Sequence, residues 1–444
     1  MTPPAPMTTP SAMERPTFES LLRGLPVLAR AGDGSVRVSA LVTDSRRIIP
    51  GSLFFALPGL RANGHAFLDE AIARGAAAVV SGDPVTGLPA VAAAQVAEPR
   101  RVLAEVARRF FGHPEAGLAL VGVTGTNGKT TITTLLRHLL QDDGSRWGLV
   151  GTVRYHLGRR SIPSYKTTPE SADLAAFFRQ MADAGCAGAC LEVSSHALHQ
   201  ERVHGFRFRV AAFTNLTRDH VDYHGDLAAY LDAKAMLFDG RNGAVPDVCV
   251  VNVDDPAGRV LAEACRRRGA VVTFGLAADA DVRAADVALD PAGAVFTVRH
   301  GGRAAAFRSA LPGGYNVSNV LCALACAAAL GRDPLALAPA LASFPGVSGR
   351  MERVEAGQPY PVFVDYAHTD DALRNALRML RDITPGRVLC VFGCGGDRDR
   401  GKRPAMTKAV AELAHLAWAT ADNPRKESLE DRKSTRLNSS HERI

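Results

Sequence analysis

Long apolar runs are absent from this 444-residue sequence. No stretch of about 20 uncharged apolar residues, the length needed to cross a bilayer, occurs in it. The N-terminus also lacks a basic start followed by an apolar segment, which is the pattern of a secretory signal. The sequence therefore predicts neither a membrane span nor secretion, and we expect a cytoplasmic protein.

Cysteine is present but lacks the spacing of metal sites. None of the eight cysteines falls in the Cys-x2-Cys pattern that chelates zinc. Six of them form pairs that are four residues apart, namely Cys186 and Cys190, Cys322 and Cys326, and Cys390 and Cys394. We interpret the cysteines as small buried side chains in a reducing compartment.

Lysine is scarce, since seven lysines stand against forty-five arginines among the 52 cationic residues. Where arginine fills nearly every cationic position, a lysine is retained either for its chemistry or by chance. Both interpretations stay open for any single lysine. Lys129 and Lys234 are the two of interest, because both lie in the motifs described below.

The net charge of +7 suits an acidic partner such as a nucleotide or an anionic metabolite. Several of the positive charges belong to the C-terminal tail. No block of lysine and arginine interleaved with aromatic residues is present, so nucleic acid is not the expected partner.

The length predicts about three domains at roughly 150 residues each. Short apolar runs alternate with helical stretches along the chain, which is typical of α/β folds with a mostly parallel sheet. We predict a disordered Pro/Thr-rich N-terminus (1–15), a small α/β domain (16–113), a central doubly wound ATPase-like domain (114–346), an incomplete Rossmann-like domain (347–427) and a polar tail (428–444).

A phosphate-binding loop is predicted where a strand meets a helix. The apolar run at 118–123 predicts a buried strand, and apolar residues at helical spacing over 132–140 predict the helix. In such a loop, backbone N–H groups converge on phosphate oxygens, Lys129 reaches the β- and γ-phosphates, and Thr130 is placed to ligate Mg²⁺. Val123 occupies the first glycine position of the general motif. The expected ATP-binding residues are Gly125, Thr126, Asn127, Gly128, Lys129, Thr130 and Thr131.

The run TGTNGKTT at 124–131 resembles the ATP loop of the Mur ligase and folylpolyglutamate synthetase superfamily. The resemblance implies that Glu192 is a magnesium ligand, that His220 is the second metal-site residue and that Lys234 is carbamylated. A carbamate turns the lysine ammonium into an anionic oxygen ligand, which arginine cannot imitate. The expected metal site is Thr130, Glu192, His220 and carbamylated Lys234, and Lys129 joins the last three as the catalytic set. Taken without the resemblance, the His220 segment is a solvated loop and Lys234 an exposed helix lysine.

Two further groups of residues are implied by the resemblance. The family's nucleotide contacts on the adenine side and near the hinge match Asn316, Asn319, Arg350 and Asp365. The positions that hold UDP-MurNAc-L-Ala-D-Glu match Ser45, with the stretch 60–62 beside it in the uridine part, and then Thr167, Thr168, Ser194, Gln200 and Arg202.

The incoming amino acid is expected to be meso-diaminopimelate. Its side-chain carboxylate is absent from lysine, and the planar fork of Arg425 suits such a group. The implied binding residues are Arg398, Asp422, Asn423, Pro424 and Arg425. ATP would convert the D-Glu γ-carboxylate into an acyl phosphate, which the amine then attacks to form the amide.

Other interpretations remain beside this one. A lysine-adding or folate-glutamate ligase is the nearest alternative, and Arg425 with the uridine-side residues weighs against both. A nucleotide-binding module without ligase activity is another. Beyond Glu427 the sequence becomes polar where family members continue. We therefore expect a C-terminal sheet that lacks its last strands and exposes apolar faces, and weak or no activity. Separately, we expect the chain to be a monomer.

Overall fold

The computed structural model describes residues 15–59, 63–85, 87–88, 91–396, 401–423 and 427. The chain divides into two compact units, the first formed by 1–282 with 321–337 and the second by 283–320 with 338–444. Each unit is described by itself. The predicted three-domain boundaries stay a prediction. Residues 1–14 of the segment 1–15 that is expected to be disordered, and the whole of the predicted polar tail 428–444, lie outside the described residues.

The first unit begins with a small sheet of five strands in the order β1-β5-β4-β3-β2. Every residue of β3 is buried, as expected for the apolar run Ser52–Ala56 in the middle of a sheet. Only the β1–β5 pair is antiparallel. The elements are α1 (Phe18–Leu22), β1 (Val27–Ala31), β2 (Ala40–Val42), η1 (Ser45–Arg47), β3 (Ser52–Ala56), η2 (Gly64–Phe67), α2 (Leu68–Ala73), β4 (Ala76–Ser81), β5 (Ala92–Val96), α3 (Pro99–Phe110) and η3 (Pro114–Gly117).

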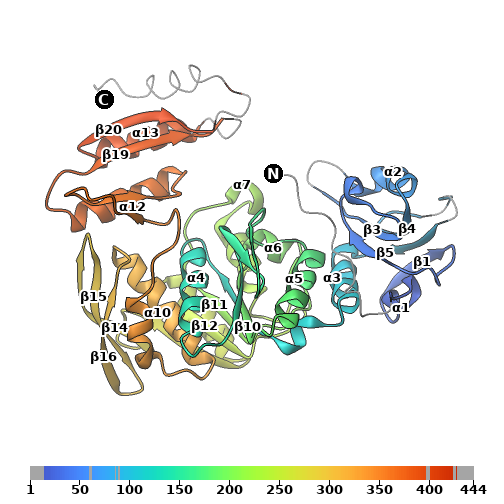
Figure 1. Ribbon diagram of the computed structural model, residues 1–444, viewed down its shortest axis with the longest axis horizontal. Helices are drawn as coiled ribbons and strands as arrows, with labels where there is room; N and C mark the ends of the chain where they lie inside the picture. Colours follow the sequence, from blue (N-terminus) through green and yellow to red (C-terminus); the bar gives the residue numbers. More distant parts are fainter. Residues whose placement is uncertain are drawn as a thin grey trace. The chain divides into compact units, whose positions relative to one another are not determined.

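Helix α3 lies between this sheet and the central strands (Figure 1). It starts at Pro99, whose missing N–H costs nothing in a first helical turn. Its buried residues Val102, Val106 and Phe110 recur at helical spacing, and they belong to a core cluster that also includes residues of both neighbouring sheets. The N-terminal sheet is therefore packed through α3 onto the central part of the same unit.

The central sheet of the first unit has the strand order β13-β12-β11-β6-β10-β7-β8-β9. The strands from β13 to β7 pair in parallel, whereas β8 and β9 are antiparallel additions. The strands are β6 (Ala119–Thr124), β7 (Trp147–Val150), β8 (Arg154–His156), β9 (Ser161–Pro163), β10 (Gly188–Glu192), β11 (Val210–Phe213), β12 (Val248–Asn252) and β13 (Ala270–Gly275). Because these strands run in parallel, the carboxyl ends of β6, β10 and β11 meet at one edge, where ligands bind in open α/β sheets.

Helices connect the parallel strands of this sheet. They are α4 (Lys129–Leu140), α5 (Ser171–Asp183), α6 (Ser195–His199), α7 (Val221–His224), α8 (Leu227–Ala235) and α9 (Pro256–Arg266), and the short η4 (Pro334–Leu337) also belongs to this unit. Leucines and Ile132 of α4 are buried. The strand, loop and helix predicted at 118–140 are thus confirmed. No helix among the described residues is long and apolar enough to cross a membrane.

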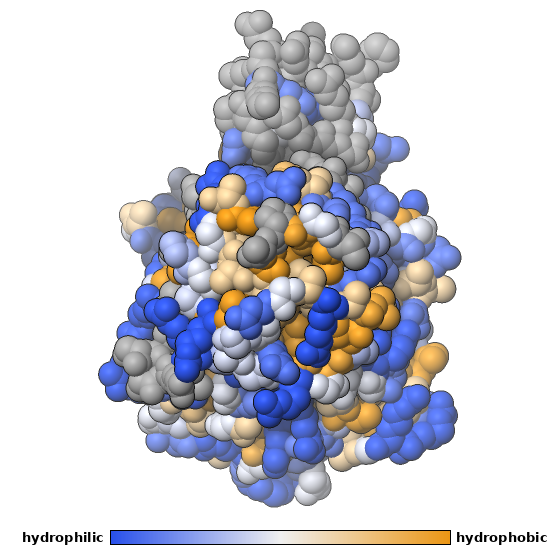
Figure 2. Space-filling model, turned by 90° about the vertical axis from the view of Figure 1, so that its right-hand side faces the viewer, coloured by the Kyte–Doolittle hydropathy of each residue, from blue (hydrophilic) through white to orange (hydrophobic). Residues whose placement is uncertain are grey.

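Figure 2 looks onto the side of the molecule where Figure 1 places the N-terminal sheet. Hydrophilic residues cover most of this face, with smaller hydrophobic areas between them. Among the exposed apolar residues of the first unit, Leu28 of β1 is 64% exposed. Isolated apolar exposure of this kind is ordinary for a folded protein.

The second unit starts with an antiparallel sheet and ends with two small sheets. β14 pairs with β15, β15 with β16, β17 with β18, and the parallel pair is β19 with β20. The elements are β14 (Val282–Asp290), β15 (Gly293–His300), β16 (Arg303–Ser309), α11 (Ala338–Ala342), β17 (Glu352–Val354), β18 (Val362–Val364), α12 (Asp370–Ile383), β19 (Leu389–Cys394), α13 (Lys402–Leu413) and β20 (Leu416–Ala421), while α10 (Gly314–Ala329) contains residues of both units.

The strands predicted near 362–365, 388–392 and 418–421 are confirmed as β18, β19 and β20. In the β19–β20 pair, Leu389 is paired with Leu416 and Val391 with Trp418. All of these side chains are 43–68% exposed. The expectation of an exposed apolar face on the C-terminal sheet is therefore met among the described residues.

Candidate active site

The loop between β6 and α4 is shaped by two glycines. Gly125 has a φ of 144°, and a Cβ atom there would lie 1.9 Å from Thr214 Oγ1. Gly128, with a φ of 88°, precedes the first residue of α4. The segment after β11 holds the loop, since Asn215 Oδ1 accepts a hydrogen bond from Asn127 N at 2.9 Å. No side chain fits at Gly125, and both glycines have the positive φ that glycine adopts most readily. The Thr126 N–H donates to the Asn215 carbonyl, so Asn215 holds the loop through two of the loop's N–H groups.

Lys129 lies at the start of α4 and turns back onto the loop. Its Nζ donates hydrogen bonds to the carbonyl oxygens of Gly125 and Thr126, both at 2.8 Å. The ammonium is thus fixed beside the amide groups that would surround a phosphate. Positive charge from the helix N-terminus and from this lysine adds at the same point.

Glu192 is buried at the carboxyl end of β10, with 1% of its surface exposed. Its carboxylate accepts hydrogen bonds from Thr130 Oγ1 at 2.9 Å, Thr152 N at 2.6 Å and Thr152 Oγ1 at 3.0 Å. Gly151 leaves room for it, because a Cβ there would lie 2.3 Å from Glu192 Oε1. The predicted pair of Thr130 and Glu192 is therefore in direct contact. Thr152 was not predicted, and its position two residues after the end of the buried strand β7 was the available signal.

Lys234 is buried in the last turn of α8, with 1% of its surface exposed. Its Nζ lies 4.1 Å from the centre of the Tyr230 ring. Burial lowers the pKa of Lys234 well below its ordinary value, and the nearby Lys129 lowers it further. No carboxylate among the described residues forms an ion pair with this ammonium. The alternative of an exposed helix lysine is therefore wrong.

A group of aromatic and imidazole rings lies around His220. The ring centres of His196 and His220 are 4.7 Å apart, and Tyr223 and His224 also pack on His196. Burial, followed by the neighbouring histidines, lowers the pKa of His196 to about 4. Burial likewise lowers the pKa of His220 and His224. The imidazoles are neutral at pH 7 and can accept a hydrogen bond or ligate a metal. Only His220 was named from sequence, although His196 and His224 were visible in the same motifs.

The suitability of this edge for magnesium follows from its donor atoms. Within the part of the chain that the structure describes, no three His, Cys, Asp or Glu side chains are placed to hold a metal ion together. Glu192 and Thr130 supply a carboxylate and a hydroxyl in contact with each other. Hard oxygen ligands of this kind suit Mg²⁺, which takes one or two carboxylates and fills its remaining positions with water and phosphate oxygens. The residues present therefore fit magnesium bound together with a nucleotide.

The residues predicted to hold the substrate peptide lie close to Glu192. Thr168 Oγ1 donates to the Glu192 carbonyl at 2.8 Å and accepts from Ser194 N at 3.1 Å. Arg202 donates to the Thr168 carbonyl at 2.9 Å and to Gln200 Oε1 at 2.7 Å. Thr167 contacts Thr152 through their hydroxyl groups at 3.2 Å. These predicted residues thus form one cluster at the same edge of the sheet.

Ser45 lies in the N-terminal sheet region, away from that cluster in sequence. It begins the short helix η1, where Asp44 caps the turn by accepting from Arg46 N. Its hydroxyl donates to Glu70 Oε2 at 2.9 Å. The neighbouring predicted stretch 60–62 lies outside the described residues.

Glu170 binds three cations and was not predicted from the sequence. Its carboxylate pairs with Arg100 at 3.3 Å, Lys166 at 3.0 Å and Arg202 at 3.1 Å. Burial alone would raise the pKa of Glu170, but the three cations hold it below its ordinary value. One carboxylate among three cations leaves this region positive, which suits an anionic substrate. Arg100 comes from α3 and also donates to the Pro58 carbonyl at 3.2 Å, so it joins the N-terminal and central parts.

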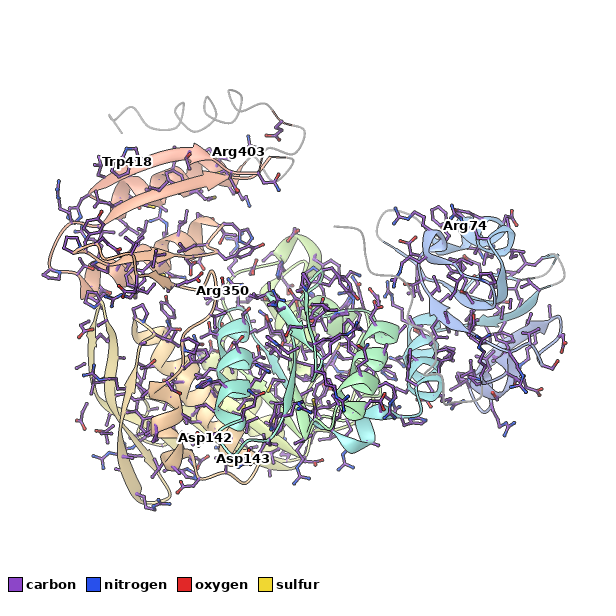
Figure 3. All side chains as sticks on the ribbon, viewed as in Figure 1. Arg74, Asp142, Asp143, Arg350, Arg403 and Trp418 are labelled. Carbon is purple, nitrogen blue, oxygen red and sulfur yellow. The ribbon has the colours of Figure 1, made fainter. Side chains whose placement is uncertain are left out.

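The residues of the second unit that are predicted to contact the nucleotide form two groups, Asn316 with Asn319 and Arg350 with Asp365. Asn319 Nδ2 donates to Asn316 Oδ1 at 2.9 Å, and Asn316 Nδ2 donates to the Pro312 carbonyl at 2.8 Å. Asp365 accepts from the backbone N–H of Met351, the residue after Arg350, at 2.8 Å. Figure 3 labels Arg350, whose guanidinium carbon lies 4.9 Å from the Tyr366 ring centre.

The predicted amino-acid site is described only in part. Asp422 accepts a hydrogen bond from Asn423 N at 2.7 Å, and the Asn423 carbonyl accepts from Gly396 N at 2.9 Å. These contacts join the ends of β19 and β20. Arg398, Pro424 and Arg425 lie outside the described residues, so their roles remain predictions.

Comparisons with known proteins agree on one family. Three family models match the chain: the Mur ligase family catalytic domain at 37–111, the Mur ligase middle domain at 123–327 and the Mur ligase glutamate ligase domain at 349–439. A UDP-N-acetylmuramoyl-L-alanyl-D-glutamate–2,6-diaminopimelate ligase of Solibacter usitatus is 45% identical over 88% of this chain and 78% of its own length. The protein of the same name from Geobacillus kaustophilus is 43% identical over 92% of this chain and 83% of its own length.

Solved structures give the same result. A structure titled as the same diaminopimelate ligase superposes with a TM-score of 0.73 at 32% identity, covering 96% of this chain and 86% of that one. A Mycobacterium tuberculosis folylpolyglutamate synthase bound to ADP and AMPPCP gives a TM-score of 0.59 at 21% identity, over 75% of this chain and 82% of that one. The second likeness concerns the fold alone.

Proposed function

Because the chain belongs to the Mur ligase family, we propose that it is the ATP-dependent ligase that joins meso-2,6-diaminopimelate to the D-Glu γ-carboxylate of UDP-MurNAc-L-Ala-D-Glu. This reaction builds a precursor of peptidoglycan. The observation that carries the proposal is the contact of buried Glu192 with Thr130 in the first turn after the phosphate loop. Substrates of this kind place the reaction in the cytoplasm, and we propose that the enzyme acts as a monomer.

ATP is bound by the loop between β6 and α4. In the proposal, the backbone amides of Gly125–Gly128 with Thr131 surround the phosphates, and the Lys129 ammonium leaves its two loop carbonyls to contact them. Thr130, Glu192, His220 and carbamylated Lys234 would hold Mg²⁺, which neutralises charge on the transferred phosphoryl group when bound. Asn316 and Asn319 would contact the adenine, and Arg350 and Asp365 the rest of the nucleotide.

The environment of Lys234 supports the proposed carbamylation. The buried amine favours its neutral form, and only a neutral amine attacks CO₂. The nitrogen lone pair forms an N–C bond to carbon dioxide, a C=O electron pair moves to oxygen, and nitrogen loses a proton to water. The product is an anionic carbamate that replaces a buried amine with oxygen ligands.

The dipeptide end of the substrate lies beside this group in the proposal. Thr167, Thr168, Ser194, Gln200 and Arg202 hold the D-Glu residue, and Ser45 contacts the uridine end. The γ-carboxylate oxygen attacks the γ-phosphorus of ATP, ADP leaves, and the diaminopimelate amine attacks the acyl carbon with loss of phosphate. Lys129 stays on the phosphoryl oxygens throughout and offsets their charge.

The amino-acid specificity is assigned to the C-terminal part. Asp422 and Asn423, together with Arg398, Pro424 and Arg425, would bind diaminopimelate. Lysine lacks the second carboxylate of diaminopimelate, so a bound lysine would leave the arginine fork unpaired. Such an unpaired group discriminates strongly against lysine as a substrate.

Phosphate release is the test of this proposal. The purified chain is given UDP-MurNAc-L-Ala-D-Glu and Mg-ATP, with diaminopimelate, lysine or glutamate. Because weak activity is expected of this chain, the rate of release is expected to be low, and we expect it to depend on diaminopimelate alone. Equal rates with lysine or glutamate would assign a different ligase, and binding of Mg-ATP in calorimetry without release in any mixture would support a nucleotide-binding chain without ligase activity.

A further inference from the structure

A pocket of about 560 Å³ lies away from the phosphate loop, and none of the proposed roles uses it. Its lining includes Arg137, Gln141, Ser145 and Arg146. Trp147 and Gly188, the first residues of β7 and β10, are paired with each other next to this lining. The pocket is therefore at the amino ends of strands whose carboxyl ends lead to Thr152 and Glu192.

Figure 3 locates this end of the first unit, because Asp142 and Asp143 directly follow the pocket residue Gln141. Both aspartates lie at the opposite end of the central strands from α7, the helix next to His220. A ligand in the pocket would thus be separated from the phosphate loop by the length of the sheet. Pockets of 300–1,000 Å³ are typical of small-molecule sites.

The two arginines give the pocket its chemistry. Arg137 donates through Nε to the Trp147 carbonyl at 2.9 Å, and Arg146 donates to the Ala184 carbonyl. Across the described ranges, neither guanidinium forms an ion pair with a carboxylate. Each guanidinium has five N–H donors, so donors remain on both. Arg137 is half-buried, and this burial lowers its pKa.

Acidic groups do not cancel this charge. No Asp or Glu lines the pocket. Asp143 is the second residue after Gln141, and its carboxylate pairs with Arg332 and accepts a hydrogen bond from the backbone N–H of Ser145. The Ser145 side chain, the Ser145 backbone N–H and Arg332 together lower the pKa of Asp143 to about 2. The carboxyl ends of α4 and α5 point here, but each helix end carries only about half a negative charge, against two full positive charges.

We propose that this pocket binds a small anion with two or more phosphate or carboxylate groups, at a site separate from the ATP site. Arginine forks bind such groups through paired hydrogen bonds. Gly158 and Gly185 also line the pocket and have no side chains to fill it. Gln141 and Ser145 offer further polar contacts on the same lining.

Titration calorimetry with inorganic pyrophosphate, and separately with citrate, tests this proposal at low ionic strength. The protein is the full chain with Lys129→Ala, so that the phosphate loop contributes little. We expect one binding site for at least one of the two anions. Pyrophosphate alone would assign a phosphate ligand and citrate alone a carboxylate ligand.

Charge variants locate the site. In the Lys129→Ala background, Arg146→Glu is expected to weaken binding at least tenfold, whereas Arg30→Glu, the same change on exposed β1, alters it less than twofold. Arg137→Lys, which keeps the charge but loses the fork, is expected to weaken binding by a smaller factor. No binding of either anion at millimolar concentration, or equal binding by Arg146→Glu, would overturn the proposal.

Thermal melting of each variant is the control that shows whether the variant folds. If Lys129→Ala does not fold, the same titrations use the wild-type chain saturated with Mg-ADP. Should the two arginines act only as caps of helix ends, Arg146→Glu would melt earlier and leave anion binding unchanged. That result contradicts the pocket but leaves the proposed ligase untouched, because phosphate release is measured independently.

Discussion

The two ends of the central sheet carry cations in different surroundings. At the carboxyl ends of the strands, Lys129 is held by loop carbonyls and Lys234 is buried against an aromatic ring. The carboxylate of Glu192 at the same edge accepts a hydrogen bond from Thr130. At the amino ends, Arg137 and Arg146 lie in a pocket that no carboxylate lines. The first end combines groups that can hold a metal and transfer a phosphoryl group, whereas the second has only the means to bind an anion. Positive charge alone therefore does not identify the reactive end of the central sheet, by which we mean the edge at the carboxyl ends of its strands.

The largest difference between the two ends is expected from Lys129→Ala. Removing the ammonium that offsets phosphate charge should lower the rate of diaminopimelate-dependent phosphate release by about 10²–10³-fold. Lys408→Ala, the same change at an exposed lysine of α13, should leave the rate within twofold. Anion binding at the amino-end pocket should persist. An unchanged rate in the Lys129 variant would contradict the assignment of the loop.

Lys234→Ala and Lys234→Arg separate charge from carbamate chemistry. Both variants should lose about 10²-fold or more in rate while still binding Mg-ATP, since an arginine forms no carbamate. Carbon-13 NMR with labelled bicarbonate should show a carbamate signal in the wild type and lose it in both variants. Full activity of Lys234→Arg would exclude the carbamate.

Glu170→Gln tests the cluster that surrounds the substrate peptide. Three cations would lose their shared carboxylate, and the unfolding free energy should fall by about 3 kcal/mol, measured by urea denaturation at pH 7. The cations lower the pKa of Glu170 in the folded chain, so its contribution is complete above the unfolded value of 4.5 and is lost as pH falls through the lower folded value. The variant should therefore lose less stability than the wild type on acidification. Equal losses would contradict the role of Glu170.

Thr152→Val is expected to have the smallest effect. It removes one hydroxyl donor from Glu192 and keeps the backbone N–H at 2.6 Å. We expect a reduction of kcat by about tenfold, because a hydrogen bond to a charged group contributes about 1.5 kcal/mol. Thr133→Val, which alters a buried hydroxyl bonded within α4, is the control. A kcat loss equal in both variants would assign the effect to packing.

Much of the reactive end was predictable from local sequence. The strand, glycine loop and helix at 118–140 follow from apolar spacing, and Glu192 follows from its place at the end of an apolar run. The motifs also indicated that Thr168, Ser194 and Arg202 belong to one site, which their hydrogen bonds now support.

Contacts between distant segments could not be predicted. Thr152 lies 40 residues before Glu192, and Arg100 lies 70 residues before Glu170, so only the folded sheet brings them together. The short α8 pattern did not distinguish a buried Lys234 from an exposed one. No sequence motif marks the pocket that Arg137 and Arg146 line. Its positive charge depends on the absence of carboxylates from the lining, which only the folded chain shows.

The joint made by Arg100 has a consequence for the length of the molecule that the enzyme accepts. Arg100 binds Glu170 on one side and the Pro58 carbonyl on the other, which fixes the separation between Ser45 and the Thr168 cluster within one unit. One amino acid adds about 3.5 Å to an extended chain. In a muramoyl precursor with one residue more or fewer, the terminal carboxylate would be displaced by about 3.5 Å from the position at which it meets the phosphoryl donor. In the proposed binding mode, precursors at neighbouring stages of assembly would then be rejected by their reach rather than by their chemical groups.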